Sequence, residues 1–128
     1  MAKTVLIVED YEKSLKLFKV IVGALGYRVL TATESEEGVR IAQVEKPDLI
    51  LMDVQMPGMD GISALKLLKK DPRTERIPVI ALTSYVMKGD RERLLNEGFT
   101  HYIPKPIDKN NFMADVQRIM EAGAGTTA

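Results

Sequence analysis

Residues 47–61 read PDLILMDVQMPGMDG, and this stretch places an acid at the end of an apolar run. Leu49 to Met52 are all apolar and have turn-forming residues on both sides, which is typical of a strand buried on both faces of a parallel sheet. Asp53 follows directly, where open α/β sheets bind ligands in the crevice beyond their strand ends. Taken alone, such an acid more often caps the following turn, so other residues must decide its role.

Four further strands are predicted from short runs of β-branched and apolar residues, at 4–9, 28–33, 77–83 and 100–104. Apolar residues at helical spacing predict a helix after each strand: over 12–25, from Ser35 to Pro47, from Ile62 to Asp71, over 88–96, and from Asp108 onward. Strands that alternate with helices through short connections imply right-handed crossovers and a parallel sheet covered on both faces. The expected fold class is therefore α/β, doubly wound.

Length and composition narrow the class of protein. The chain has 128 residues, the length of one domain, and Lys plus Arg equals Asp plus Glu at 18 each, so no basic excess favours nucleic acid. It contains no Cys, which excludes disulfides and cysteine nucleophiles and fits a cytoplasmic location. The apolar start is too short for a signal peptide, and we expect no membrane insertion. Residues 1–121 should form the domain, and the small, polar residues 122–128 a flexible tail.

Polar residues stand at the carboxyl ends of several predicted strands: Glu9 and Asp10, Asp53, Thr83 and Ser84, and Lys105. Three carboxylates in one crevice repel one another unless they are protonated or joined by a cation, and an oxygen-rich site suits Mg²⁺. A hydroxyl and an ammonium beside the metal can hold phosphate oxygens. Each residue alone has an ordinary structural role, and it is the joint pattern that predicts a site for a phosphoryl group. The chain has neither G-x-G-x-x-G nor a P-loop motif, which argues against a nucleotide enzyme.

Four segments resemble the receiver domain of response regulators. They are VLIVED at 5–10, DLILMDVQMPGMDG at 48–61, ALTS at 81–84 and KP at 105–106, so the resemblance spans nearly the whole chain. It implies a flavodoxin-like fold with a five-stranded parallel sheet in the order 2-1-3-4-5 and five helices. A further segment, YVMKGDRERL at 85–94, resembles the single-domain cell-cycle regulators of the DivK kind.

The resemblance also implies a role for each polar residue at the strand ends. Asp53 would be the phosphoacceptor, and the metal ligands would be Glu9, Asp10, Asp53 and the backbone carbonyl of Gln55, holding Mg²⁺. Thr83 would supply the switch hydroxyl, Lys105 the phosphate-binding ammonium, and Tyr102 the aromatic side chain that turns when Thr83 moves. A cis peptide bond is expected between Lys105 and Pro106.

These roles predict a phosphorelay response regulator that takes a phosphoryl group from a histidine kinase or histidine phosphotransfer protein and then binds a downstream protein. It would be a monomer or weak dimer, and not an enzyme beyond its own phosphoryl transfer and autodephosphorylation. One alternative is an aspartate-nucleophile phosphohydrolase, although Gln55 stands where haloacid-dehalogenase-type phosphatases usually carry a general acid. Another is a scaffold that binds partners without phosphorylation.

Two surfaces are candidates for partner contact. The first comprises Tyr85, Val86, Met87, Tyr102 and Met113, with Met120 also placed outside the main apolar stripe of the last helix. The second is the helix over 12–25, where the run from Leu17 to Val22 has more apolar residues than one buried stripe requires. His101 has no partner acid at a recognisable spacing and is expected to play no part.

Overall fold

The computed structural model describes residues 3–56, 58–84 and 89–126. Strands and helices alternate along these parts of the chain as predicted, with only their ends displaced. The elements are β1 (Thr4–Val8), α1 (Glu12–Ala24), β2 (Arg28–Ala32), α2 (Ser35–Glu45), β3 (Leu49–Asp53), α3 (Gly61–Lys70), β4 (Val79–Thr83), α4 (Asp90–Glu97), β5 (His101–Pro104) and α5 (Lys109–Thr126).

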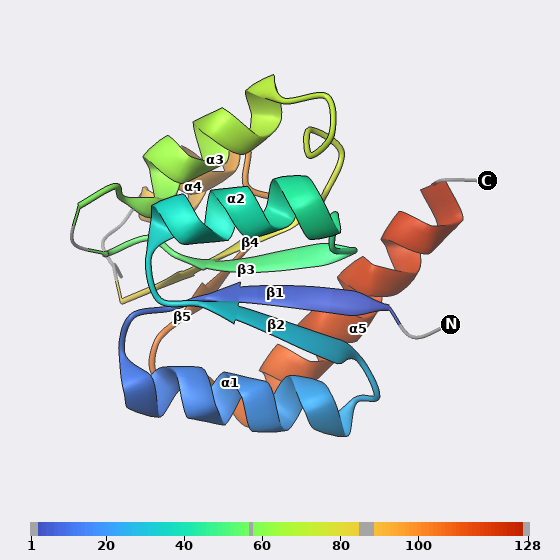
Figure 1. Cartoon of the computed structure of the whole chain (residues 1–128). Helices are drawn as coiled ribbons and strands as arrows, with labels where there is room; N and C mark the ends of the chain where they lie inside the picture. Colours follow the sequence, from blue (N-terminus) through green and yellow to red (C-terminus); the bar gives the residue numbers. More distant parts are fainter. Residues whose placement is uncertain (1–2, 57, 85–88, 127–128) are drawn as a thin grey trace.

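The strands form one parallel sheet in the order β2-β1-β3-β4-β5, as the resemblance implied (Figure 1). Helices α1 and α5 cover one face of the sheet, and α2, α3 and α4 cover the other (Figure 1). The predicted fold class is therefore confirmed as a doubly wound α/β sheet. Because all strands are parallel, their carboxyl ends meet along one edge, and the predicted site residues lie there.

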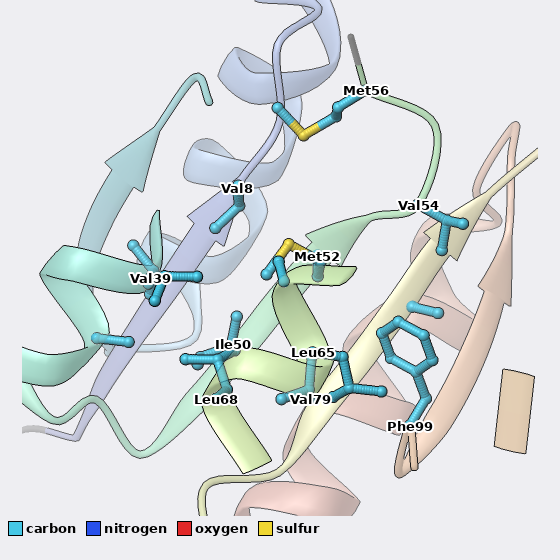
Figure 2. Packing of buried hydrophobic residues seen from close by; sticks show 14 of the residues in the cluster. Val8, Val39, Ile50, Met52, Val54, Met56, Leu65, Leu68, Val79 and Phe99 are labelled. Atoms are coloured by element: carbon cyan, nitrogen blue, oxygen red, sulfur yellow. The ribbon is translucent and has the colours of Figure 1, made fainter. Parts of the chain in front are cut away.

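The central strand β3 contributes to two hydrophobic clusters, one on each face of the sheet. Ile50 and Met52 belong to the cluster beneath α2, α3 and α4, whereas Leu49 and Leu51 belong to the cluster beneath α1 and α5. Figure 2 shows the first cluster, with Ile50 and Met52 among the side chains that fill it. Every residue of β3 is buried, which explains why its sequence shows an unbroken apolar run and not an alternation.

Helix α5 differs from its prediction in two ways. It continues to Thr126, past the boundary at residue 121 where the tail was expected, and Ala122 and Ala124 are residues that favour helix. Met120 was expected to face a partner, but it is only 3% exposed. Since Met120 lies one turn after the buried Val116, the apolar stripe of the helix is wider than predicted and includes it.

The rings of Phe18 and Phe112 join α1 to α5, with centroids 5.5 Å apart and an interplanar angle of 20°. Stacked aromatic pairs of this kind add to the free energy gained by burial alone. Among the helices of the described residues, none has the length and apolar character needed to cross a membrane.

Candidate functional site

Asp53 is the last residue of β3, and the sheet holds it between the ends of two neighbouring strands. β3 pairs with β1 on one side and with β4 on the other, where Asp53 lies opposite Leu82. The N–H of Val54 donates to the carbonyl of Leu82 at 3.0 Å, so the pairing continues one residue past the strand. Asp53 is 3% exposed, and its backbone position is therefore fixed by the sheet rather than by a mobile turn.

Gly61 allows the start of α3 to lie directly against the backbone that follows β3. A Cβ at this position would lie 2.7 Å from the backbone oxygen of Asp53 and 2.8 Å from Cα of Val54, closer than real Cβ contacts. The N–H of Gly61 donates to the Val54 carbonyl at 3.1 Å. The carboxylate of Asp60 accepts from the N–H of Ser63 at 2.7 Å and caps α3. The helix start and the end of β3 therefore form one tightly packed unit.

The acids predicted to converge do so. Glu9, Asp10 and Asp53 each have a carboxylate oxygen within 4.8 Å of the others, with Glu9 and Asp53 buried and Asp10 exposed. Hard divalent cations prefer oxygen ligands of this kind and retain waters at the open positions of such a site. The donor set therefore fits a magnesium-type ion, with the exposed Asp10 on the side that faces solvent.

Lys105 supplies positive charge to the same crevice. Its Nζ lies 2.5 Å from Oε1 of Glu9 and 3.2 Å from Oδ2 of Asp53. The N–H of Lys105 donates to the carbonyl of Thr83 at 2.8 Å, and the Lys105–Pro106 peptide bond is cis, as predicted. The ammonium thus joins an acid that follows β1, Glu9, to the acid that ends β3, Asp53.

Burial and the nearby charges shift the pKa values of Glu9 and Lys105. Burial raises the pKa of Glu9 to about 7, the hydrogen bond and charge of Asp53 act in the same direction, and Lys105 opposes them. Burial lowers the pKa of Lys105, but the hydrogen bonds and charges of Glu9 and Asp53 outweigh this, so its pKa is raised. Lys105 is therefore charged at neutral pH, whereas Glu9 titrates there in the absence of a metal.

Each carboxylate oxygen of Asp53 has a donor, because Oδ1 accepts from the N–H of Gln55 at 3.0 Å and Oδ2 from Lys105. The side chain of Gln55 makes a second connection that the sequence did not reveal. Its Oε1 accepts from the N–H of Ser84 at 3.3 Å and also from the Ser84 hydroxyl. These contacts join the loop after β3 to the loop after β4, and no sequence spacing signals a contact between segments so far apart.

Thr83 and Tyr102, the predicted switch pair, lie on neighbouring strands. Thr83 ends β4, is fully buried and pairs with Pro104, whereas Tyr102 pairs with Ala81. Because side chains alternate along a strand, Ala81, Thr83 and Tyr102 share one face of the sheet. Tyr102 is half-buried and packs against the cluster beneath α2, α3 and α4.

The expectation that His101 lacks a partner acid is wrong. Its Nε2 lies 3.1 Å from Oδ2 of Asp115, and Arg118 lies 3.3 Å from Oδ1 of the same carboxylate. Packing of β5 beside α5 creates this contact, which sequence spacing does not signal. A cavity of about 380 Å³ adjoins it and is lined by residues of α4, β5 and α5 and of the loop between the last two.

The predicted partner surfaces are described in part. Tyr85, Val86 and Met87 lie outside the described residues, and Met113 is half-buried. On the other surface, Leu17 and Val20 of α1 are 47% and 69% exposed.

The fold and the site together define the class of protein. A family model described as response regulator receiver domain matches residues 5–117, and the chain belongs to this family of two-component signalling phosphoacceptors. The matched range contains all the acids of the crevice, together with Thr83 and Lys105.

Sequence similarity to individual proteins places the chain more closely within the receiver family. The polar-differentiation response regulators DivK of Brucella anthropi and of Brucella abortus strain 2308 are each 42% identical over 117 residues, covering 91% of this chain and 95% of the relative. We therefore describe the chain as a DivK-like receiver.

Solved structures show the same fold. The receiver domain of a sensor histidine kinase from Pseudomonas aeruginosa PAO1, described with a magnesium ion coordinated in its active-site cleft, has a TM-score of 0.83 and 34% identity, covering 98% of this chain and 99% of that one. A CheY-like response regulator receiver domain protein from Methanospirillum hungatei JF-1 has a TM-score of 0.87 and 28% identity, with the same coverage of 98% and 99%.

Proposed function

We propose that this protein accepts a phosphoryl group on Asp53 from a histidine kinase or histidine phosphotransfer protein, in a reaction that requires Mg²⁺, and that the phosphorylated form binds a downstream protein differently. The observation that carries this proposal is the crevice itself. In it, the buried carboxylate of Asp53 lies beside two other acids, Glu9 and Asp10, and in contact with the Lys105 ammonium.

Asp53, Gln55 and Lys105 have different roles in the proposed phosphoryl transfer. A carboxylate oxygen of Asp53 forms a bond to phosphorus as the phosphorus–nitrogen bond of the donor phosphohistidine breaks, and the imidazole leaves with the bonding electrons and takes up a proton. The N–H of Gln55 and the ammonium of Lys105 hold the two oxygens of Asp53 in a fixed orientation for this attack. Lys105 also stands where it can meet the charge of the arriving phosphoryl group.

Three acids of this chain suit the metal, namely Glu9, Asp10 and Asp53, and they would hold it together with the backbone carbonyl of Gln55. When bound, Mg²⁺ offsets the negative charge that the phosphoryl group adds beside these carboxylates. The raised pKa of Glu9 means that protons compete with the cation for this carboxylate near neutral pH.

The downstream partner is proposed to dock on the face formed by α4, β5 and α5. Tyr102 shares a sheet face with Thr83, so a movement at the site has a short path to β5. This face also carries the cavity and the contact between His101 and Asp115. The exposed Leu17 and Val20 of α1 are proposed as contacts for the phosphoryl donor, on the opposite side of the sheet from α4.

Acetyl phosphate with Mg²⁺ tests the chemistry. We expect intact-mass spectrometry to show one added phosphoryl group per chain, and none when Mg²⁺ is chelated. Asp53→Asn should abolish the addition, and Asp10→Asn should weaken Mg²⁺ binding. Asp115→Asn is the matched control, because this acid lies on α5 and contacts His101 and Arg118, and it should label as the wild type does.

Three outcomes would contradict this proposal. Labelling of Asp53→Asn at the wild-type rate would place the acceptor elsewhere. Release of many phosphates per chain from different phosphomonoesters would indicate a phosphohydrolase. Absence of any addition to the wild type would indicate a scaffold that works without phosphorylation.

A further inference from the structure

A bridge of two hydrogen bonds joins the loop after β3 to the loop after β4, close to Asp53. The Oε1 atom of Gln55 accepts from both the N–H and the hydroxyl of Ser84, and both residues are exposed. Asp53, from the strand that precedes Gln55, is 3% exposed. In the unphosphorylated protein, a neutral amide oxygen therefore occupies both donors of Ser84.

Both ends of the bridge are tied to the phosphoacceptor. The backbone N–H of Gln55 donates to Oδ1 of Asp53 at 3.0 Å. Ser84 lies two residues beyond Leu82, which is paired with Asp53 across the sheet. A group attached to Asp53 must project beyond the carboxyl ends of the strands, which is the edge where Ser84 presents its two donors.

We propose that the side-chain oxygen of Gln55 is a place-holder for a phosphoryl oxygen, and that Gln55 and the phosphoryl group compete for the N–H and hydroxyl of Ser84. This inference rests on the proposed function. A phosphoryl group brings about 1.5–2 negative charges and three strong acceptor oxygens, and hydrogen bonds to an ionised acceptor are about twice as strong as those to a neutral one. The exchange breaks no covalent bond, and the protons stay on Ser84.

The competition predicts the direction in which the affinity for a phosphoryl mimic changes when Gln55 is replaced. Removing the Gln55 side chain leaves the donors of Ser84 to water, since Ser84 is exposed, and no buried group loses its partner. The phosphorylated state then no longer has to displace the bridge. A net hydrogen bond corresponds to a change of about 2- to 10-fold in an equilibrium constant, and the affinity for a phosphoryl mimic should rise by this factor.

Titration with beryllofluoride at saturating Mg²⁺, followed by calorimetry, measures that affinity. Gln55→Ala should bind beryllofluoride about 2- to 10-fold more tightly than the wild type. Gln55→Met, which keeps the length of the side chain without its amide oxygen, should do the same. Gln117→Ala removes an exposed glutamine from α5 and should leave the affinity unchanged. In a Ser84→Ala background the gain from Gln55→Ala should shrink, because only the N–H remains to compete for.

Mg²⁺ affinity, titrated separately for each variant without beryllofluoride, gives the Mg²⁺ concentration that saturates that variant, so a change in metal binding is not mistaken for a change in beryllofluoride binding. Unchanged or weaker binding of beryllofluoride by Gln55→Ala at saturating Mg²⁺ would overturn the place-holder role. A gain that persists in full in the Ser84→Ala background would also overturn it. If the wild type binds no beryllofluoride and takes no phosphoryl group from acetyl phosphate, the proposed function itself fails.

Discussion

Glu9 shows how burial controls the chemistry of a single residue. Its pKa lies near 7 in the folded protein without metal, against an ordinary value of 4.5, because the carboxyl is buried and faces Asp53. Between these two pH values the folded protein keeps a proton that the unfolded chain has lost. The stabilisation that this proton provides is complete below about 4.5 and is lost as the pH rises through about 7.

We therefore expect the free energy of unfolding of the metal-free protein to fall as the pH rises from about 4.5 to about 7. Urea denaturation in the presence of a chelator, repeated across this range, measures it. Glu9→Gln should remove most of the slope, whereas Glu36→Gln, which changes an exposed acid of α2, should keep it. A free energy of unfolding of the wild type that rises between about pH 4.5 and 7 would contradict the raised pKa of Glu9. Added Mg²⁺ should stabilise the protein more at the upper end of the range, where protons no longer compete.

The position of a residue at a strand end could be predicted from the sequence, but its contacts could not. Glu9, Asp53 and Lys105 lie at one end of the sheet because parallel strands bring their carboxyl ends together there, which the strand pattern predicts. The strand order that brings these three residues into contact was implied by the family resemblance. The bridge between Gln55 and Ser84 depends on the course of two loops. It joins segments whose separation carries no periodic signal, so only the structure reveals it.

At the scale of elements, the start of α3 and the end of β3 determine where Asp53, the proposed phosphoacceptor, lies. Gly61 is the point of closest approach, and any side chain there would meet backbone atoms of Asp53 and Val54. Backbone atoms of a central strand cannot yield as the end of a flexible side chain does. A substitution at Gly61 should therefore move the site as well as cost stability.

Gly61→Ala is expected to lower the free energy of unfolding by about 1–3 kcal/mol, as overpacking does in other proteins, and to slow labelling by acetyl phosphate. Gly23→Ala is the matched control, because a Cβ at Gly23 meets nothing within 4 Å and alanine favours helix. It should raise stability by about 0.5–1 kcal/mol and leave labelling unchanged. Equal stability and equal labelling of Gly61→Ala and the wild type would show that the backbone there yields easily.

Helix α5 shows why the set of buried residues on a helix was harder to predict than the helix itself. Its apolar residues are spaced so that Met120 continues the buried stripe, yet Phe112, Val116 and Ile119 already satisfied the helical pattern. Whether a fourth is buried depends on how far the sheet and α1 extend beneath the helix. That is a property of packing, which a pattern along one segment does not contain.

At the scale of the molecule, the sheet separates two layers of helices, and the predicted switch residues Thr83 and Tyr102 belong to one of them. Thr83 and Tyr102 lie on the face covered by α2, α3 and α4, near the edge strand β5. A coupling of about 1–3 kcal/mol between the site and this edge would change partner affinity about 5- to 150-fold. Strand β2 lies at the opposite side of the sheet from β5 and meets the site at its last residue, Ala32, whose carbonyl accepts from the N–H of Glu9 at 3.0 Å.

We expect beryllofluoride with Mg²⁺ to change the amide chemical shifts of residues 100–103, while those at the start of β2, residues 28–30, stay constant. Thr83→Ala should suppress the changes in β5 and preserve those next to Asp53, because the hydroxyl that moves is missing. Two-dimensional NMR spectra of the labelled protein measure both regions at once. Shift changes confined to the neighbours of Asp53 in the wild type would mean that Thr83 and Tyr102 do not carry the signal.

The contact between Lys105 and Glu9 joins residues 96 positions apart in the chain. During synthesis the amino-terminal part of a chain emerges first, so the acids of β1 and β3 leave the ribosome well before the lysine that neutralises them. Until β5 follows, the nascent protein carries uncompensated carboxylates, and β4 lacks its outer neighbour. A chain cut short before Lys105 would therefore keep a repulsive acid cluster that only bound protons or a cation could relieve.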